Sequence, residues 1–252
     1  MWDAEGEELS EMALALTDAP ARGLDLPQVA KELAGHIARL PGAEAVTVLV
    51  RGPGGTLVSA AASGPHTERL EQAQAEAGQG PCRDAVSSGE ALVNIDLAQL
   101  PVRARWPRIA PQALAAGLTA ATAVPLRHHG GALGAVGIFH RYGALAREQV
   151  RAAEVLARAA AQGWAQVEAL RAVRKHADHL NEALQSRIVI EQAKGIVSER
   201  LECQVDEAFE SMRRYARSRS MKLRLLAHTI VWGPPQQGPF PRRARTSDRP
   251  RV

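Results

Sequence analysis

The chain has 252 residues, 46% of them hydrophobic and 23% charged, with a formal net charge of +4. This composition excludes disordered, collagen-like and membrane-spanning chains and fits a cytoplasmic globular protein of one or two domains. Residues 1–170 carry 14 basic against 18 acidic groups and residues 171–252 carry 17 against 9, so only the second part is suited to a polyanionic partner.

Helix and strand patterns alternate through the first 147 residues. Apolar side chains at helical spacing predict helices over residues 9–16 and 26–40. Two β-branched runs around a Gly/Pro turn predict a hairpin over residues 45–60. Further helices are expected at 68–77, 82–87 and 112–116, strands at 91–95, 119–126 and 133–139, and a loop at 101–111. This pattern predicts an α+β domain with an antiparallel sheet over residues 25–147, after an N-terminal helix in residues 1–24.

From about residue 148 the pattern changes to one long helix. Its apolar side chains are spaced by three and four residues, at Leu156, Ala160, Gly163, Val167, Leu170, Val173, Ala177, Leu180 and Leu184. This narrow seam is typical of a coiled coil and predicts a homodimer formed through the linker helix 148–184. Several of these side chains are small and bury little area, so the alternative is that the first half of the helix packs on the sheet of its own chain.

Residues 185–232 predict three short amphipathic helices around one small core. The expected core side of the first helix carries Ile188, Val189, Ala193, Ile196, Val197 and Leu201. The second and third helices carry Val205, Ala208, Phe209, Met212 and Ala216, then Leu223, Leu226, Ala227 and Ile230. Opposite the first core side, a polar stripe of Arg187, Glu191, Lys194 and Ser198 is predicted to face solvent or a partner. Solvated helix faces, duplex DNA binding and RNA-loop binding all fit the surrounding basic residues.

One segment in this region carries a family resemblance. Residues 183–197, ALQSRIVIEQAKGIV, followed by the run DEAF at residues 206–209, resemble the ANTAR domain, the RNA-binding module of transcription antitermination regulators. The resemblance covers about residues 175–231 and implies a dimer that holds paired stem-loops of a nascent transcript. The predicted RNA contacts are Arg187, Glu191, Gln192, Lys194, Gly195, Arg200, Arg213, Arg214, Arg217 and Lys222.

The chain departs from the ANTAR pattern where the first helix of the domain ends. Glu202 stands where the family usually has Gly, and Gln204 stands where the next helix usually has a Ser or Thr cap. These two residues predict a poorly capped junction between the helices.

Residues 25–165 are similar to the GAF domains that precede ANTAR modules in actinobacterial regulators. The residues that carry this similarity include GQGPCRDA at 78–85, Trp106-Pro107, AVPL at 123–126 and LGA at 133–135. The similarity implies a central antiparallel sheet with helices on one face and, in many relatives, a small-molecule pocket on the other. The candidate pocket residues are Cys82, Asp96, Trp106 and Phe139. Cys82 follows Gly-Pro at a helix start, which favours a thiolate, with a packed structural cysteine as the alternative.

No catalytic or metal-ligating set is recognisable. The two cysteines, Cys82 and Cys203, fit neither a disulfide framework nor a zinc cluster. His128 and His129 precede two glycines in an expected turn, with no other ligand at metal-type spacing. We therefore predict no enzyme, no metal and no named cofactor.

The last segment, residues 233–252, is rich in proline and then in arginine, so it is predicted to be a disordered basic tail. Its arginines, expected to add nonspecific attraction to phosphate, are Arg242, Arg243, Arg245, Arg249 and Arg251.

Together the two resemblances imply an RNA-binding antitermination regulator in which a sensory domain, with an unidentified small-molecule effector, controls a dimeric output domain. The alternatives are a DNA-binding transcriptional regulator and a ligand-sensing protein that binds no nucleic acid.

Overall fold

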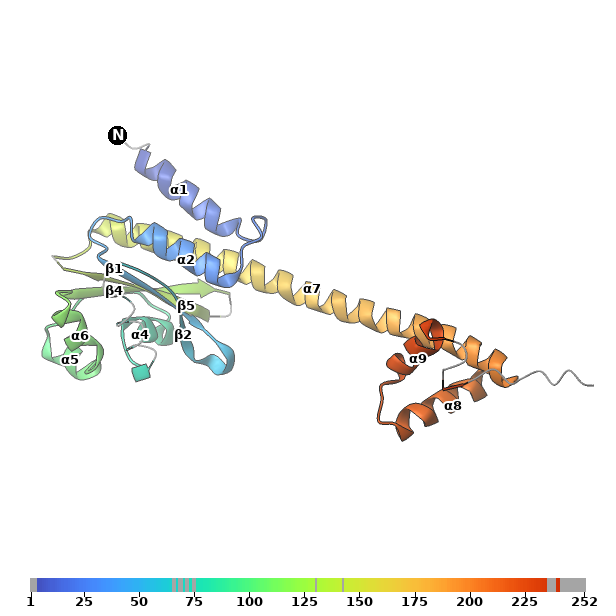
Figure 1. Cartoon of the computed structure of the whole chain (residues 1–252). Helices are drawn as coiled ribbons and strands as arrows, with labels where there is room; N and C mark the ends of the chain where they lie inside the picture. Colours follow the sequence, from blue (N-terminus) through green and yellow to red (C-terminus); the bar gives the residue numbers. More distant parts are fainter. Residues whose placement is uncertain are drawn as a thin grey trace, which may run out of the picture. The chain divides into compact units, whose positions relative to one another are not determined.

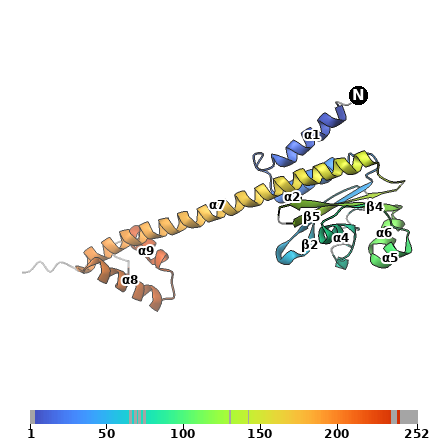
Figure 2. The same ribbon diagram turned by 180° about the vertical axis from the view of Figure 1, so that it is seen from behind.

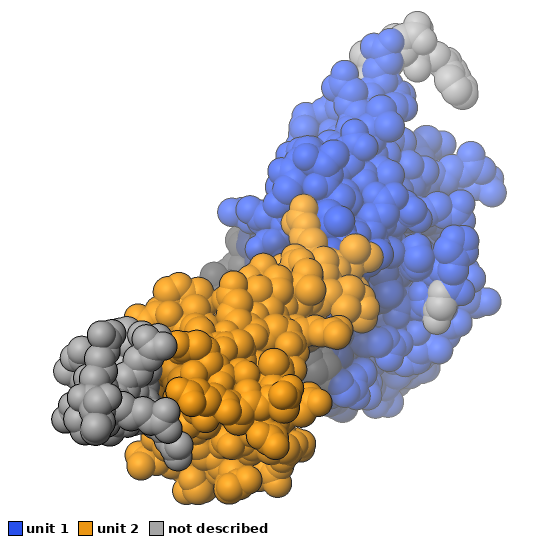
Figure 3. All heavy atoms as spheres, turned by 90° about the vertical axis from the view of Figure 1, so that its right-hand side faces the viewer, with its two compact units in different colours: residues 1–171 blue, residues 172–252 orange. Residues whose placement is uncertain are grey.

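The computed structural model describes residues 4–64, 67, 70, 73, 76–129, 131–141, 143–234 and 239–240. The chain divides into two compact units, residues 1–171 and 172–252 (Figure 3). The boundary between the units lies inside one helix, within the linker 148–184 that the sequence predicts.

The first unit is built around a five-stranded antiparallel sheet with the strand order β2-β1-β5-β4-β3 (Figure 1). Its strands are β1 (Ala45–Arg51), β2 (Leu57–Ser63), β3 (Leu92–Asp96), β4 (Ala120–His128) and β5 (Gly131–His140). The predicted hairpin is formed by β1 and β2 around a short 3-10 turn, η1 (Pro53–Gly55). The three other predicted strands correspond to β3, β4 and β5, so the predicted antiparallel sheet is confirmed.

Helices cover both faces of this sheet. The helices of the first unit are α1 (Ala4–Thr17), α2 (Leu26–Ile37), α4 (Pro81–Ser88), α5 (Leu100–Arg105), α6 (Ile109–Ala115) and the first part of α7 (Arg147–Leu201). In Figure 1 and, from behind, in Figure 2, α2 and α7 lie on one face, and α4, α5 and α6 lie on the other. The expectation of helices on one face alone is therefore wrong.

Local sequence signals explain where some of these helices begin. Helix α2 starts at a reciprocal capping box, in which the Asp25 side chain accepts from the Gln28 backbone N–H and the Gln28 side chain accepts from the Asp25 N–H. The expected loop at 101–111 instead contains α5 and the start of α6, because Pro101 and Pro111 fall in first helical turns, where no N–H is needed. Of the predicted helix 68–77, residues 70, 73, 76 and 77 are helical and the others lie outside the described residues.

Alternation along the strands divides the core of the first unit into two layers. Val46 and Val48 of β1 and Ile138 of β5 face α2 and α7, while Phe139 of β5 faces the layer of α5 and α6. The first half of the predicted coiled-coil seam joins the α2 side of this core, where Leu156, Ala160 and Val167 are buried. These residues therefore pack on their own chain, which was the alternative to a coiled coil.

Gly163 belongs to this packing. A Cβ atom at Gly163 would lie 2.0 Å from the backbone oxygen of Leu16, at the end of α1. The two helices approach each other so closely here that only glycine fits. The glycine in the seam is thus explained by the contact between α1 and α7.

The second unit contains the predicted three-helix core, formed by the end of α7, α8 (Val205–Ser218) and α9 (Leu223–Trp232). Its buried residues are Ala193, Val197, Ala208, Met212, Ala216, Leu226, Ala227, Ile230 and Phe240. Ile188, predicted for this core, is 42% exposed, because it points away from α8 and α9, and Ile190 packs there instead. The burial of Phe240 also corrects the predicted disorder of the tail at this residue, whereas the five tail arginines lie outside the described residues.

Candidate nucleic-acid interface

The predicted contact residues come from all three helices of the second unit. Arg187, Glu191 and Gln192 are exposed on α7. On α8, the exposed arginines are Arg213, Arg214 and Arg217, and Lys222 is exposed at the start of α9. Arg187 and Glu191 of the predicted stripe and the three α8 arginines are therefore open to solvent, as an interface with a polyanion requires, whereas Lys194 and Ser198 of the stripe are partly buried.

Lys194 is held over an aromatic ring. Its Nζ lies 2.9 and 3.1 Å from the two carboxylate oxygens of Glu191 and 5.0 Å from the ring centre of Phe209 on α8. Arg213, which pairs with Glu210 at 2.8 Å, has its guanidinium carbon 5.6 Å from the centre of the same ring. Phe209 thus carries two cations at the junction of α7 and α8.

Helical spacing predicts a core position for Phe209, yet its side chain is only half-buried. Spacing alone cannot separate a core ring from a ring that supports surface cations. A signal that would have found it is the flanking charge, because Lys194 and Arg213 belong to the predicted contacts and Phe209 lies four residues before Arg213.

Gly195 has open space around it. Apart from its chain neighbours and the adjacent backbone of α7, no heavy atom of the described residues lies within 4 Å of a Cβ atom built at this position, and the residue is exposed within α7. Glycine in a helix interior costs about 1 kcal/mol relative to alanine. No close contact with another described part of the chain explains why glycine stands here. The absence of a side chain would instead allow a binding partner to approach the backbone of α7 closely.

Two of the polar residues assigned to the interface face inward. Arg200 is 8% exposed and donates from Nη1 to the backbone oxygen of Phe240, at 3.2 Å. Ser198 donates from Oγ to the backbone oxygen of Cys203, at 2.6 Å. Arg200 therefore holds the segment after α9, and Ser198 closes the end of α7. Arg200, predicted as an RNA contact, is therefore buried, and Ser198 of the polar stripe is partly buried, because the chain turns back on itself where α7 ends.

The junction between α7 and α8 has the backbone that its sequence predicts. Glu202 adopts a left-handed conformation with φ of 52°, which glycine takes at the least cost. Gln204 is the N-cap of α8 and makes no side-chain hydrogen bond to the helix. The start of α8 is therefore poorly capped, as predicted, whereas the end of α7 is closed by backbone hydrogen bonds from Cys203 to Ser198, at 3.2 Å, and from Glu202 to Glu199, at 3.4 Å.

Comparison with known families finds a family match in each of the two units. The sequence profile of the GAF domain family matches residues 23–165, more than half of the chain. The chain belongs to the GAF domain family. The profile of the ANTAR domain matches residues 178–231, so the second unit carries an ANTAR domain, the RNA-binding module of antitermination regulators. The protein thus joins a sensory domain to an RNA-binding regulatory domain. No curated protein matches the chain.

Solved structures agree with the fold of the first unit. The GAF domain from Acinetobacter phosphoenolpyruvate-protein phosphotransferase is 11% identical, with a TM-score of 0.54 over 67% of this chain and 97% of that chain. A methyl-accepting chemotaxis protein, residues 122 to 287, is 19% identical, with a TM-score of 0.50 over 62% of this chain and 99% of that chain. At these identities the likeness shows the GAF fold alone.

In the GAF domain, three of the four candidate pocket residues are packed side chains. Cys82, Trp106 and Phe139 are almost completely buried on the sheet face that α4, α5 and α6 cover. The indole N–H of Trp106 donates to Asp84 at 2.7 Å. Asp96 is exposed, and its carboxylate accepts from the Ala98 backbone N–H at 2.9 Å. These four side chains fill or cap the layer rather than line a common cavity.

The Cys82 thiol also has a packed environment. Its Sγ lies 3.8 Å from Oγ1 of the buried Thr47, and the residue is inaccessible to solvent. This favours a structural role for Cys82 over a reactive thiolate, because reactive thiols must be accessible to solvent.

Among the described residues, no helix combines the length and the hydrophobicity needed to cross a bilayer.

Proposed function

We propose that the protein binds paired RNA stem-loops as a dimer, and that the GAF domain controls this binding. The observation that carries the proposal is the pair of cations, Lys194 and Arg213, over the Phe209 ring, with the exposed Gly195 next to Lys194 in α7. A helix surface without a side chain, flanked by cations, is suited to a phosphate backbone or an unstacked loop base.

The residues divide into two roles in this proposal. Arg187, Arg214, Arg217 and Lys222 are exposed and make phosphate contacts. Lys194 also contacts a phosphate, from the position in which Glu191 and Phe209 hold it. In the second role, Gln192, exposed on the same helix, offers an amide to a base edge. Preorganisation of Lys194 reduces the side-chain entropy that binding would cost.

The dimer follows from the middle of α7. Residues 171–185 are exposed at every position, and Val173, Leu180 and Leu184 are 65%, 61% and 56% exposed. With Ala177 they follow the spacing of four, three and four residues that two-helix coiled coils use. A second copy of the chain, which offers the same seam, is therefore the occupant that fits it.

Regulation in this proposal runs along α7, whose single helix of 55 residues contributes to the cores of both domains. A signal in the GAF domain would change how the two copies of α7 pair, and so how the two ANTAR domains are presented to two RNA loops. A helix pair with two alternative registers is an established kind of switch.

The proposal is tested by binding of the full chain to a two-loop RNA, a single-loop RNA and a duplex DNA across a range of salt concentrations. We expect preference for the two-loop RNA. Lys194→Ala should weaken that complex several-fold and lower the slope of log affinity against log salt by about one, because one phosphate contact is lost. The dimer should remain intact.

Lys175→Ala is the matched control, since Lys175 is an exposed lysine of the same helix outside the proposed contacts. It should bind the two-loop RNA as the unchanged chain does. Equal losses from Lys175→Ala and Lys194→Ala would contradict the assigned surface. Preference for duplex DNA would favour a DNA-binding regulator, and the absence of binding to any of the three would favour a sensor that acts through other partners.

A further inference from the structure

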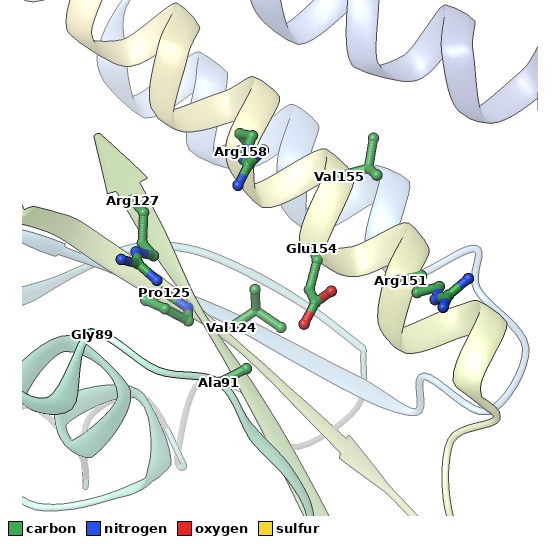
Figure 4. Close-up of a pocket in the computed structure, with 9 residues that line it drawn as sticks. All are labelled: Gly89, Ala91, Val124, Pro125, Arg127, Arg151, Glu154, Val155 and Arg158. Carbon is green, nitrogen blue, oxygen red and sulfur yellow. The ribbon is translucent and has the colours of Figure 1, made fainter. Parts of the chain in front are cut away.

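The GAF domain has a pocket that the RNA-binding proposal does not use. It has a volume of about 440 Å³ and lies between β4 and the first turns of α7 (Figure 4). Its lining residues are Gly89, Ala91, Val124, Pro125, Arg127, Arg151, Glu154, Val155 and Arg158. Val124 belongs to the core layer on the α2 and α7 side. The pocket therefore lies on the opposite side of the sheet from the packed residues Cys82, Trp106 and Phe139.

Charge distinguishes this pocket. Three arginines and one glutamate line it, which leaves two uncompensated positive charges. Within the described part of the chain, none of these four side chains forms an ion pair or a hydrogen bond, whereas other arginines of the domain pair with carboxylates, as Arg22 does with Glu32 and Arg141 with Glu44. The cluster is therefore available to an external anion.

The positions of the charged groups define what the pocket can hold. In Figure 4, Arg127 and Arg158 lie at one end of the pocket, Arg151 lies at the other, and Glu154 points from α7 toward the strand between them. Guanidinium groups bind phosphate and carboxylate oxygens through paired, charge-assisted hydrogen bonds. A carboxylate beside them accepts a hydrogen bond from a hydroxyl or amine of the same ligand, and Val124 and Pro125 supply apolar contact.

We propose that this pocket binds a small organic dianion, a phosphate monoester or a polycarboxylate, that also carries a hydrogen-bond donor for Glu154. Its volume lies within the range of about 300–1,000 Å³ that is typical of small-molecule sites. The ligand contacts β4 through Arg127 and α7 through Arg158. It therefore stabilises the docking of the first turns of α7 on the sheet, because a ligand favours the state that it binds.

The test is calorimetric titration of the full chain with adenosine 5′-monophosphate, citrate and adenosine, the last as a neutral analogue. We expect at least one of the two anions to bind and adenosine not to bind. Arg127→Gln and Arg158→Gln should each weaken the binding by about tenfold or more, as expected for the loss of a charge-assisted contact. Binding of adenosine 5′-monophosphate alone assigns a phosphate ester, and binding of citrate alone assigns a carboxylate.

Two control variants separate this site from the RNA surface. Arg103→Gln removes an exposed arginine on α5, outside the pocket, and should leave anion binding unchanged. Lys194→Ala should also leave it unchanged, while it weakens RNA binding. The proposal is overturned if neither anion binds above a sodium chloride control of equal ionic strength, if adenosine binds as well as its monophosphate, if both pocket variants bind as the unchanged chain does, or if Lys194→Ala abolishes anion binding.

Discussion

Two single residues in this protein occupy unfavourable local environments. The first is Glu202, whose backbone conformation is unfavourable for a residue with a side chain. Glu202 ends α7 with a positive φ angle, a conformation that costs a residue with a Cβ atom about 1–2 kcal/mol. The chain accepts this cost because the turn between α7 and α8 must bring Phe209 and Met212 back against α7. The strain is a consequence of the tight turn between the two helices. Among the described residues, the Glu202 side chain forms no hydrogen bond or ion pair that would offset it.

Glu202→Gly is therefore expected to stabilise the ANTAR domain by about 0.5–1 kcal/mol, the relief of strain less the entropy that glycine loses on folding. Chemical denaturation followed by circular dichroism measures the change. Glu207→Gly, at an exposed position in the first turn of α8, is the control and should destabilise by up to about 1 kcal/mol, the cost of glycine in a helix interior. Destabilisation by both changes would show that the φ angle of Glu202 carries no strain.

His140 is the second such residue, because its imidazole is buried in the GAF domain. Burial lowers the pKa of its imidazole, and the hydrogen bond from Nδ1 to the Gly143 carbonyl, 2.9 Å long, opposes this only in part. Its Nε2 is buried without a hydrogen-bond partner among the described residues. The folded GAF domain therefore holds His140 neutral at pH values where the unfolded chain binds a proton.

This difference predicts a loss of stability in acid. The contribution of His140 is fully present above its ordinary pKa of 6.5 and is lost as the pH falls from there toward the lowered folded value. Urea denaturation between about pH 7.5 and about pH 5.5 should show a smaller loss in His140→Phe than in the unchanged chain. His36, whose pKa burial also lowers, accounts for part of the remainder. His176→Gln, an exposed histidine on α7, should retain the original dependence, and an unchanged slope in His140→Phe would remove His140 as its cause.

At the scale of secondary-structure elements, α7 changes its environment along its length. Leu156 to Val167 pack in the GAF core, residues 171–185 are exposed on every side, and Ala193 and Val197 pack in the ANTAR core. An isolated helical segment of this length is marginal in water. The exposed middle of α7 is therefore the part of the helix whose stability would increase most on pairing with a second helix.

The seam predicts a specific effect on oligomeric state. Val173→Glu combined with Leu180→Glu should convert the dimer to a monomer at micromolar concentration, because like charges would meet across a coiled-coil seam. Both side chains are exposed in the single chain, so folding should be unaffected. Analytical ultracentrifugation measures the change.

Ala172→Glu combined with His179→Glu gives the matched control for the seam. It places the same charges, with the same spacing, at exposed positions about 100° round the helix. This pair should remain dimeric. A dimer that survives in the seam variant, or one lost equally in the control, would falsify the pairing through this face.

At the scale of the whole molecule, the protein has separate hydrophobic cores in its two units. The buried clusters of the GAF domain lie within residues 12–167, and that of the ANTAR domain lies within residues 193–240. No described residue belongs to both. Unfolding of the full chain is therefore not expected to be a single two-state transition.

Differential scanning calorimetry should resolve two transitions, and core substitutions assign them. Met212→Ala, at a fully buried position of α8, should lower only the transition of the ANTAR domain, and Leu33→Ala of α2 should lower only that of the GAF domain. Each truncation is expected to cost about 2–5 kcal/mol through lost burial and a cavity. If either substitution shifts both transitions equally, the domains unfold as one cooperative unit.

Much of this organisation could be predicted from the sequence, because it rests on local periodicity. The strands, the three amphipathic helices and the exposed seam at Val173, Leu180 and Leu184 all follow from the spacing of apolar residues, which fixes the face of an element that a residue occupies. The departure at Glu202 is also visible in the sequence, by comparison with the ANTAR pattern, because a helix end with a left-handed residue favours glycine.

Only the tertiary structure determined which of these faces pack against another part of the chain. Leu156 and Leu180 belong to the same apolar pattern, yet only Leu156 is buried, because only the first part of α7 meets a sheet. Arg200 and Lys194 are both basic, yet the segment at Phe240 covers Arg200 alone. The pocket around Arg127 and Arg158 joins residues from β4 and α7 that are distant in the chain. Periodicity carries no information on contacts between distant segments, so these outcomes depend on the packing of the whole chain.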